Sequence, residues 1–105
     1  MGVYGTHLYV LWIPDGELCK IGRSSNCERR LMQIRAYMPW LHVEIAAMFP
    51  DGGWVETTMH DAFKSRRCGR EWFKVPKDEA IATANMYLSC LNKPRPKLSR
   101  KTEVS

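Results

Sequence analysis

Several features that define other protein classes are missing from this sequence of 105 residues. No apolar run approaches the roughly 18 residues that cross a bilayer, and the first residues do not form a secretory leader. The four cysteines form no C-x-x-C pair and no Cys and His spacing of the zinc-finger type. We therefore expect a cytoplasmic protein with reduced, mostly buried thiols and no membrane span.

Length and composition favour one folded domain. With 45% apolar and 10% aromatic residues, the chain can bury a core, which excludes disorder for most of it. The formal net charge of +5 indicates a polyanionic partner. Most of this charge follows Asn92, where five basic residues stand against Glu103 and give +4. We expect a domain over residues 1–92 and a basic disordered tail over residues 93–105.

The first half of the domain is predicted to form a hairpin and a helix. Residues 7–13 and 18–22 are rich in strand-forming residues and flank a Pro-Asp-Gly-Glu turn. Ser25 and Glu28 then have the spacing of a capping box, which predicts a helix from about 26 to 37.

The second half is predicted to contain a strand, a helix, a short edge segment and a final helix. Alternating apolar residues over 41–49 predict a strand with one buried face, and a helical stripe follows over 54–67. Residues 71–75 form the edge segment, and the last helix begins after Pro76 and turns Ile81, Ala84, Leu88 and Leu91 toward the core. The expected fold is α/β of the α+β kind, a three-stranded, mainly antiparallel sheet flanked by helices in the order β-β-α-β-α-β-α.

The most informative stretch joins the hairpin to the first helix. Tyr9 lies in the first strand, Lys20-Ile21-Gly22 begins eleven residues later, and Arg30 follows Gly22 by eight residues. This spacing resembles the GIY-YIG superfamily of nucleases. In that superfamily two strand motifs form a hairpin, and a helix carries an arginine eight residues after the second glycine. The resemblance implies a small nuclease fold.

Later motifs resemble one branch of this superfamily, first catalogued from a phage T5 open reading frame and a yeast meiotically up-regulated gene. Members carry Lys-Ile-Gly, a later Glu with a His four residues on, and a Gly-x-Glu-Trp-Phe segment. Glu56, His60 and residues 69–73 stand in these places. The resemblance covers about residues 7 to 75, and small relatives of this kind occur in phages and mobile elements.

Phosphodiester hydrolysis requires an activated water, a countercharge for the phosphate and help for the leaving oxygen. Arg30 suits the countercharge role because its guanidinium is always cationic and matches phosphate oxygens in two contacts. Glu56 suits one hard cation, Mg²⁺ or Mn²⁺, which takes few protein carboxylates. The resemblance implies the same two roles and a single-metal endonuclease or nicking enzyme.

Other residues would support this reaction. The resemblance implies that Tyr9 orients or deprotonates the attacking water, and deprotonation requires a depressed pKa that Lys20, Arg30 or the metal would provide. His60 lies one helical turn after Glu56 and could relay a proton or hold that carboxylate. Glu71 is a possible supporting residue that caps or pairs with a basic neighbour. We expect Tyr9, Lys20, Arg30, Glu56 and His60 to line one concave site.

DNA is the expected partner, with RNA left open, and no membrane is expected. Basic side chains would contact the backbone without reading sequence. They are Arg23, Arg29, Arg35, Lys64, Arg66, Arg67 and Arg70.

Two alternatives stay open. Many relatives place Tyr or His where this chain has apolar Ile34, which favours a regulatory nucleic-acid-binding module of the same fold with weak or no turnover. The second alternative is a protein-interaction domain that presents Trp40 and Trp54.

Overall fold

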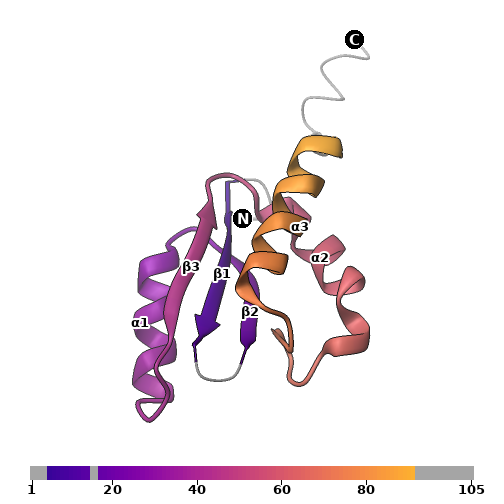
Figure 1. Ribbon diagram of the computed structural model, residues 1–105. Helices are drawn as coiled ribbons and strands as arrows, with labels where there is room; N and C mark the ends of the chain where they lie inside the picture. The colour runs from indigo at the N-terminus through magenta and orange to yellow at the C-terminus, as the bar shows by residue number, and fades with distance from the viewer. Residues whose placement is uncertain (1–4, 15–16, 92–105) are drawn as a thin grey trace.

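The computed structural model describes residues 5–14 and 17–91 (Figure 1). The predicted tail over 93–105 and the centre of the hairpin turn lie outside these ranges. The elements, in chain order, are β1 (His7–Ile13), β2 (Leu18–Ser24), α1 (Cys27–Tyr37), β3 (Glu44–Phe49), the 3₁₀ turn η1 (Gly53–Val55), α2 (Glu56–Ala62), the 3₁₀ turn η2 (Lys64–Arg66), β4 (Trp72–Phe73) and α3 (Lys77–Cys90).

The sheet contains four antiparallel strands in the order β3-β1-β2-β4, so the expectation of three strands is wrong. The predicted hairpin is confirmed, with β1 and β2 paired over their full length. The fourth strand arises because both later segments pair, one on each edge. β3 pairs with β1, whereas β4 contributes only Trp72 and Phe73 against β2.

Helices cover both faces of the sheet (Figure 1). Alternate side chains of β1 divide between them, because successive residues of a strand point to opposite faces. Tyr9 and Leu11 pack in the cluster that contains the apolar stripe of α1. Leu8 and Val10 pack with residues of α2 and α3. β1 is therefore buried on both sides and forms the centre of the domain.

The expected alternation over 41–49 is wrong because β3 contains a bulge. Val10 pairs with Ala47 and Leu11 with Ile45, which leaves Ala46 as the extra residue. Ile45 packs in the cluster on the α1 face, while Phe49 packs on the face of α2 and α3. The bulge thus moves Phe49 to the face opposite Ile45.

Two helix predictions also require correction. The predicted helix over 54–67 is divided into η1, α2 and η2, and α2 itself ends at Ala62. The N-cap of α1 is Asn26, whose side chain accepts a hydrogen bond from the Arg29 backbone N–H at 3.0 Å, so Ser25 does not cap this helix.

The final helix begins as predicted after Pro76, and its expected buried face is confirmed for Ala84 and Leu88 but not for the other two residues. Ala80 and Ala84 are its fully buried residues. Ile81 is only partly buried, and Leu91 lies just beyond the helix and is exposed. Small side chains on the buried face let α3 approach the sheet closely.

All four cysteines are free thiols, as expected. Cys19 and Cys27 are buried, whereas Cys68 and Cys90 are exposed, so two of the four thiols are buried rather than most of them. Among the described residues, no helix has the length and apolar character to cross a membrane.

Candidate active site

A pocket of about 500 Å³ opens at the edge of the sheet beside β2. It exists because β4 is short: Trp72 pairs with Lys20, and one further backbone bond joins Ile21 N–H to the Glu71 carbonyl. Side chains from both faces of the sheet can therefore reach the edge beside β2. The lining residues are Lys20, Arg30, His60, Arg70, Glu71 and Trp72.

Tyr9 lies beneath the edge of this pocket and is almost fully buried. It pairs with Gly22 across the hairpin, and its hydroxyl lies over the glycine backbone. Burial raises the pKa of the Tyr9 phenol well above its ordinary value, and the nearby Glu71 and Glu56 carboxylates raise it further. Arg30 opposes this effect but is outweighed. The protein's own groups therefore raise the pKa of Tyr9, and a depressed pKa would have to come from the metal, the remaining source that was considered.

Lys20 and Glu71 form an ion pair at the pocket wall. The Lys20 ammonium also lies 5.6 Å from the centroid of the Tyr9 ring. The expectation that Glu71 pairs with a basic neighbour is confirmed. The pair holds the segment before β4 against β2 and places one positive and one negative group beside the phenol.

Arg30 and Arg70 are the cationic side chains of the pocket that have no protein partner within the described ranges. Arg30 is exposed on α1 and also lines two neighbouring pockets. Since no carboxylate occupies its guanidinium, Arg30 is available to bind an anion.

Glu56 begins α2 and lies on the other side of the sheet edge. One carboxylate oxygen is 3.5 Å from the Arg23 guanidinium, and the other is 3.9 Å from His60 Nε2. Neither contact is a hydrogen bond, and burial raises the pKa of the Glu56 carboxyl despite the opposing charges of His60, Arg23 and Lys20. Glu56 and His60 therefore lie on the same face of α2, as predicted.

His60 is fixed by the backbone of β2. Its Nε2 donates a hydrogen bond to the Ile21 carbonyl at 2.7 Å, which requires that this nitrogen carries the proton. Its ring also contacts Phe73 at 5.1 Å between centroids. These contacts hold His60 between the pocket and the carboxylate of Glu56.

The expectation that all five predicted residues line one concave site is correct only in part. Lys20, Arg30 and His60 do so, whereas Tyr9 and Glu56 lie next to it. Arg30 and Glu56 belong to helices on opposite faces of the sheet, yet both charges act on the pKa of Tyr9.

Comparison with known protein families gives a match that covers the region of the candidate site. The family model of the T5orf172 domain matches residues 6–88. The chain belongs to the T5orf172 domain family. The match extends from the start of β1 almost to the end of α3, so the T5orf172 domain contains the whole candidate site. No curated protein and no solved structure matches the chain.

The donor set of this T5orf172 domain limits the kind of metal that could bind. No cluster of three or more His, Cys, Asp or Glu side chains suited to a metal occurs in the described part of the chain. Glu56 nevertheless offers a half-buried carboxylate that accepts no hydrogen bond from described residues. This fits Mg²⁺, which retains waters and takes further ligands from substrate phosphates.

The predicted nucleic-acid-binding residues separate into free and engaged cations. Arg35 donates two hydrogen bonds to the Val43 carbonyl, at 2.8 and 3.0 Å, and so joins α1 to the segment before β3. Arg66 pairs with Glu79 on α3, which raises the pKa of the guanidinium and lowers that of the carboxyl. These two residues are structural in this arrangement.

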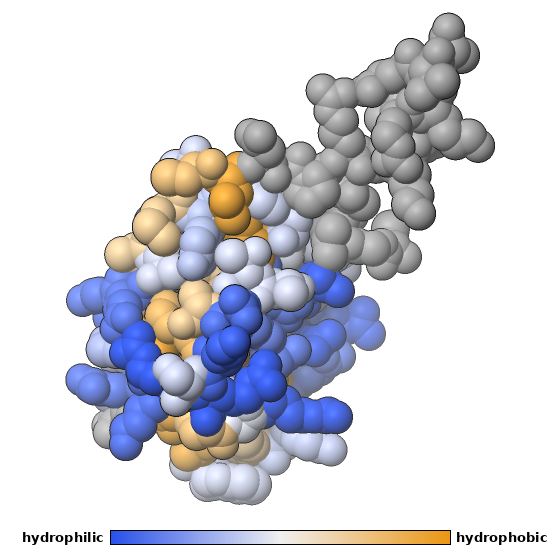
Figure 2. Space-filling model, turned by 90° about the vertical axis from the view of Figure 1, so that its right-hand side faces the viewer, coloured by the Kyte–Doolittle hydropathy of each residue, from blue (hydrophilic) through white to orange (hydrophobic). Residues whose placement is uncertain are grey.

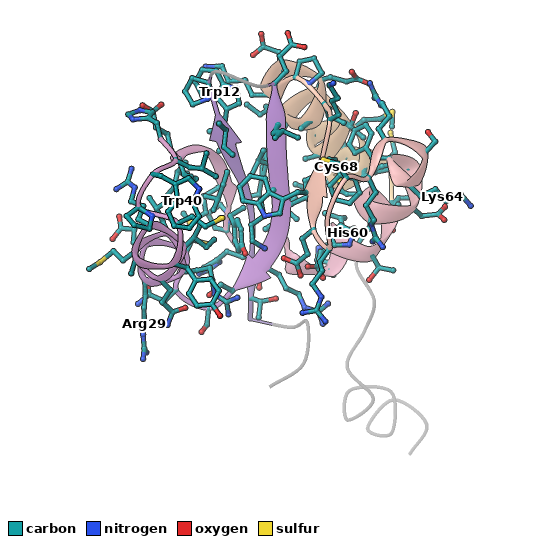
Figure 3. The ribbon with its side chains drawn as sticks, turned by 90° about the horizontal axis from the view of Figure 1, so that it is seen from below. Trp12, Arg29, Trp40, His60, Lys64 and Cys68 are labelled. Carbon is teal, nitrogen blue, oxygen red and sulfur yellow. The ribbon has the colours of Figure 1, made fainter. Side chains whose placement is uncertain are left out.

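The remaining basic residues are spread widely around the domain. Arg29 and Lys64 point outward on opposite flanks, with His60 between them (Figure 3). Lys64 is 3.6 Å from Asp61, and Arg67 lies over the Phe73 ring. Figure 2 shows hydrophilic side chains gathered over the lower part of the face that carries α2.

Sequence reasoning missed a second pocket of about 350 Å³ that shares Lys20, Arg30 and Trp72 with the first. Tyr37 is 85% exposed beside it. The helical spacing of Arg30, Ile34 and Tyr37 was the signal that could have identified this surface. Trp54, by contrast, packs against the core, so it is not the exposed interaction residue that was expected, whereas Trp40 is 74% exposed.

Proposed function

We propose that this protein is a metal-dependent endonuclease or nicking enzyme that hydrolyses DNA phosphodiester bonds. The T5orf172 domain is related to nuclease folds of the GIY-YIG kind, which supports this proposal. The observation that carries it is the link between Arg30 and Glu56: Arg30 lines one pocket with His60, whose Nε2 lies 3.9 Å from the Glu56 carboxylate. One group is an unpaired cation suited to phosphate, and the other is an oxygen donor suited to a hard metal ion.

Each group has a role that follows from its chemistry. Arg30, with Arg70 beside it, binds the phosphate and compensates the negative charge that develops on it. Glu56 would hold one Mg²⁺ or Mn²⁺, which supplies Lewis-acid stabilisation of the phosphate oxygens when bound. His60 keeps the Glu56 carboxylate in place through its own bond to Ile21. In the reaction, water oxygen bonds to phosphorus while the bond to the leaving oxygen breaks.

The neutral phenol of Tyr9 restricts its role. A protonated phenol can donate and accept hydrogen bonds, so Tyr9 orients the attacking water rather than removing its proton. In the Lys20–Glu71 ion pair beside Tyr9, the Glu71 carboxylate is then the group that accepts the proton of this water, and the Lys20 ammonium is the group that donates one to the leaving oxygen. This assignment differs from the deprotonation by Tyr9 that was considered from the sequence.

A second candidate is a DNA-binding module of the same fold that lacks turnover. The raised pKa of Tyr9 and the apolar Ile34 beside Arg30 favour it. Both candidates share the cationic pocket and predict binding that weakens as salt rises. They differ only in hydrolysis.

Plasmid nicking with and without Mg²⁺ distinguishes the candidates. Wild type should nick in the presence of the ion, and Glu56→Ala and Arg30→Ala should each lose at least about a hundredfold in rate. Lys74→Ala and Asp78→Asn are matched controls, because both residues are exposed outside the pocket. Undiminished activity in Glu56→Ala and Arg30→Ala would contradict the site assignment. Salt-sensitive binding without cleavage by wild type, under several metals, would favour the binding module.

A further inference from the structure

We propose that the second pocket binds an unpaired nucleobase next to the phosphate held by Arg30. This inference rests on the proposed function and identifies the part of the substrate that the pocket receives. Ile34, Tyr37, Met38 and Trp72 supply apolar walls, and Lys20 and Arg30 form its charged border. An apolar slot with a cationic border matches the two parts of a nucleotide.

The two pockets are adjacent in the way that a nucleotide requires. They share Lys20, Arg30 and Trp72, so a group bound in one lies beside a group bound in the other. In a nucleotide, the base is joined through one sugar to its phosphate. A phosphate at Arg30 therefore places its base within reach of the apolar pocket.

Two aromatic side chains border this pocket. Tyr37 is exposed on the last turn of α1, and Trp72 lies partly buried in β4, where it pairs with Lys20. Bases stack on aromatic rings with little regard to sequence. Gln33 also lines the pocket, and its side-chain amide, which bonds to none of the described residues, can pair with the polar edge of a base.

The charge of the border favours a nucleic acid over an apolar protein segment. No acidic residue lines the second pocket, and of its two cations Lys20 is paired with Glu71 while Arg30 is unpaired. A base within a duplex has both faces covered by its neighbours, so only an unpaired or extruded base can enter. We therefore infer a substrate with single-stranded or locally opened structure at the cleavage site.

Binding without divalent cations tests this inference separately from hydrolysis. The probes are a labelled single-stranded oligodeoxynucleotide and the same strand with abasic residues in place of its bases, compared by fluorescence anisotropy. Wild type should bind the intact strand on the order of tenfold more tightly, the effect of one lost base stack. Tyr37→Ala should bind the two strands equally, whereas Tyr37→Phe should retain the preference.

Met32→Ala is the matched control, because Met32 is an exposed residue of α1 outside this pocket. Circular dichroism and thermal melting establish that each variant is folded. Equal binding of both strands by wild type, or a full preference in Tyr37→Ala, would overturn the inference. If wild type still cleaves DNA when the nucleobase site is overturned, the proposed nuclease function is retained without that site. If wild type prefers the intact strand but does not cleave DNA, the proposed hydrolysis is contradicted and the nucleobase site is retained.

Discussion

Tyr9 lies directly across the hairpin from Gly22, and its phenol covers the glycine backbone. A β carbon at position 22 would overlap the end of the Tyr9 ring and would lie 3.1 Å from a carboxylate oxygen of Glu71. The missing side chain therefore gives the phenol its place at the sheet edge. The phenol can occupy this buried place only because residue 22 is glycine.

The first prediction concerns this contact. Gly22→Ala should lower the free energy of unfolding by about 1–3 kcal/mol, because the added methyl group overpacks a buried site. Tyr9→Leu removes both the hydroxyl and the Cζ atom that would overlap this methyl group and should reduce that loss, which a double-mutant cycle in urea measures. Gly69→Ala is the matched control, since a β carbon there would only touch Trp72 at an ordinary 3.4 Å. Equal losses at positions 22 and 69 would contradict the observed packing.

The second prediction separates free from engaged arginines. Arg70→Ala should reduce the salt dependence of DNA binding by about 0.9 in the slope of log K against log salt, the effect of one lost phosphate contact. Arg66→Ala should change the slope less, because Glu79 and the Phe63 ring already engage this guanidinium. Anisotropy titrations at several salt concentrations give both slopes. A larger change of slope in Arg66→Ala than in Arg70→Ala would contradict this division into free and engaged arginines.

The third prediction uses the buried thiol of Cys19. Burial raises its pKa from 9.0 to about 11, although Lys77 opposes the shift. At a pH between these two pKa values, the Cys19 thiol keeps its proton in the folded protein but has lost it in the unfolded chain. The free energy of unfolding therefore falls as pH rises through this interval. Cys19→Ala loses this contribution, and its stability difference from wild type should shrink across the same interval. Urea denaturation at several alkaline pH values measures the difference, and a constant gap would contradict the assignment.

Local sequence patterns predicted much of the site. The spacing from Tyr9 to Arg30 follows from a hairpin joined directly to a helix, and both elements have strong local signals. The four-residue separation of Glu56 and His60 was enough to place both on one helical face. Such relationships depend on neighbouring residues and on regular geometry, which the sequence records.

Other features depend on contacts between distant segments. The bulge at Ala46 follows from how β3 pairs with β1, and β4 forms only because Trp72 and Phe73 meet the free edge of β2. Deprotonation of Tyr9 would need Lys20, Arg30 or the metal to lower its pKa, and in the fold burial and two carboxylates outweigh Arg30. Neither strand pairing nor burial of one phenol is encoded in a short pattern.

The central claim is that Arg30 and Glu56, on opposite faces of the sheet, act on one phosphodiester. Its most direct test is the Mg²⁺-dependent cleavage rate of Arg30→Ala, Glu56→Ala and the double variant under single-turnover conditions. Groups that act as a unit are not additive, so each single variant should lose at least about a hundredfold and the double variant little more. A wild-type rate in either single variant would contradict the claim.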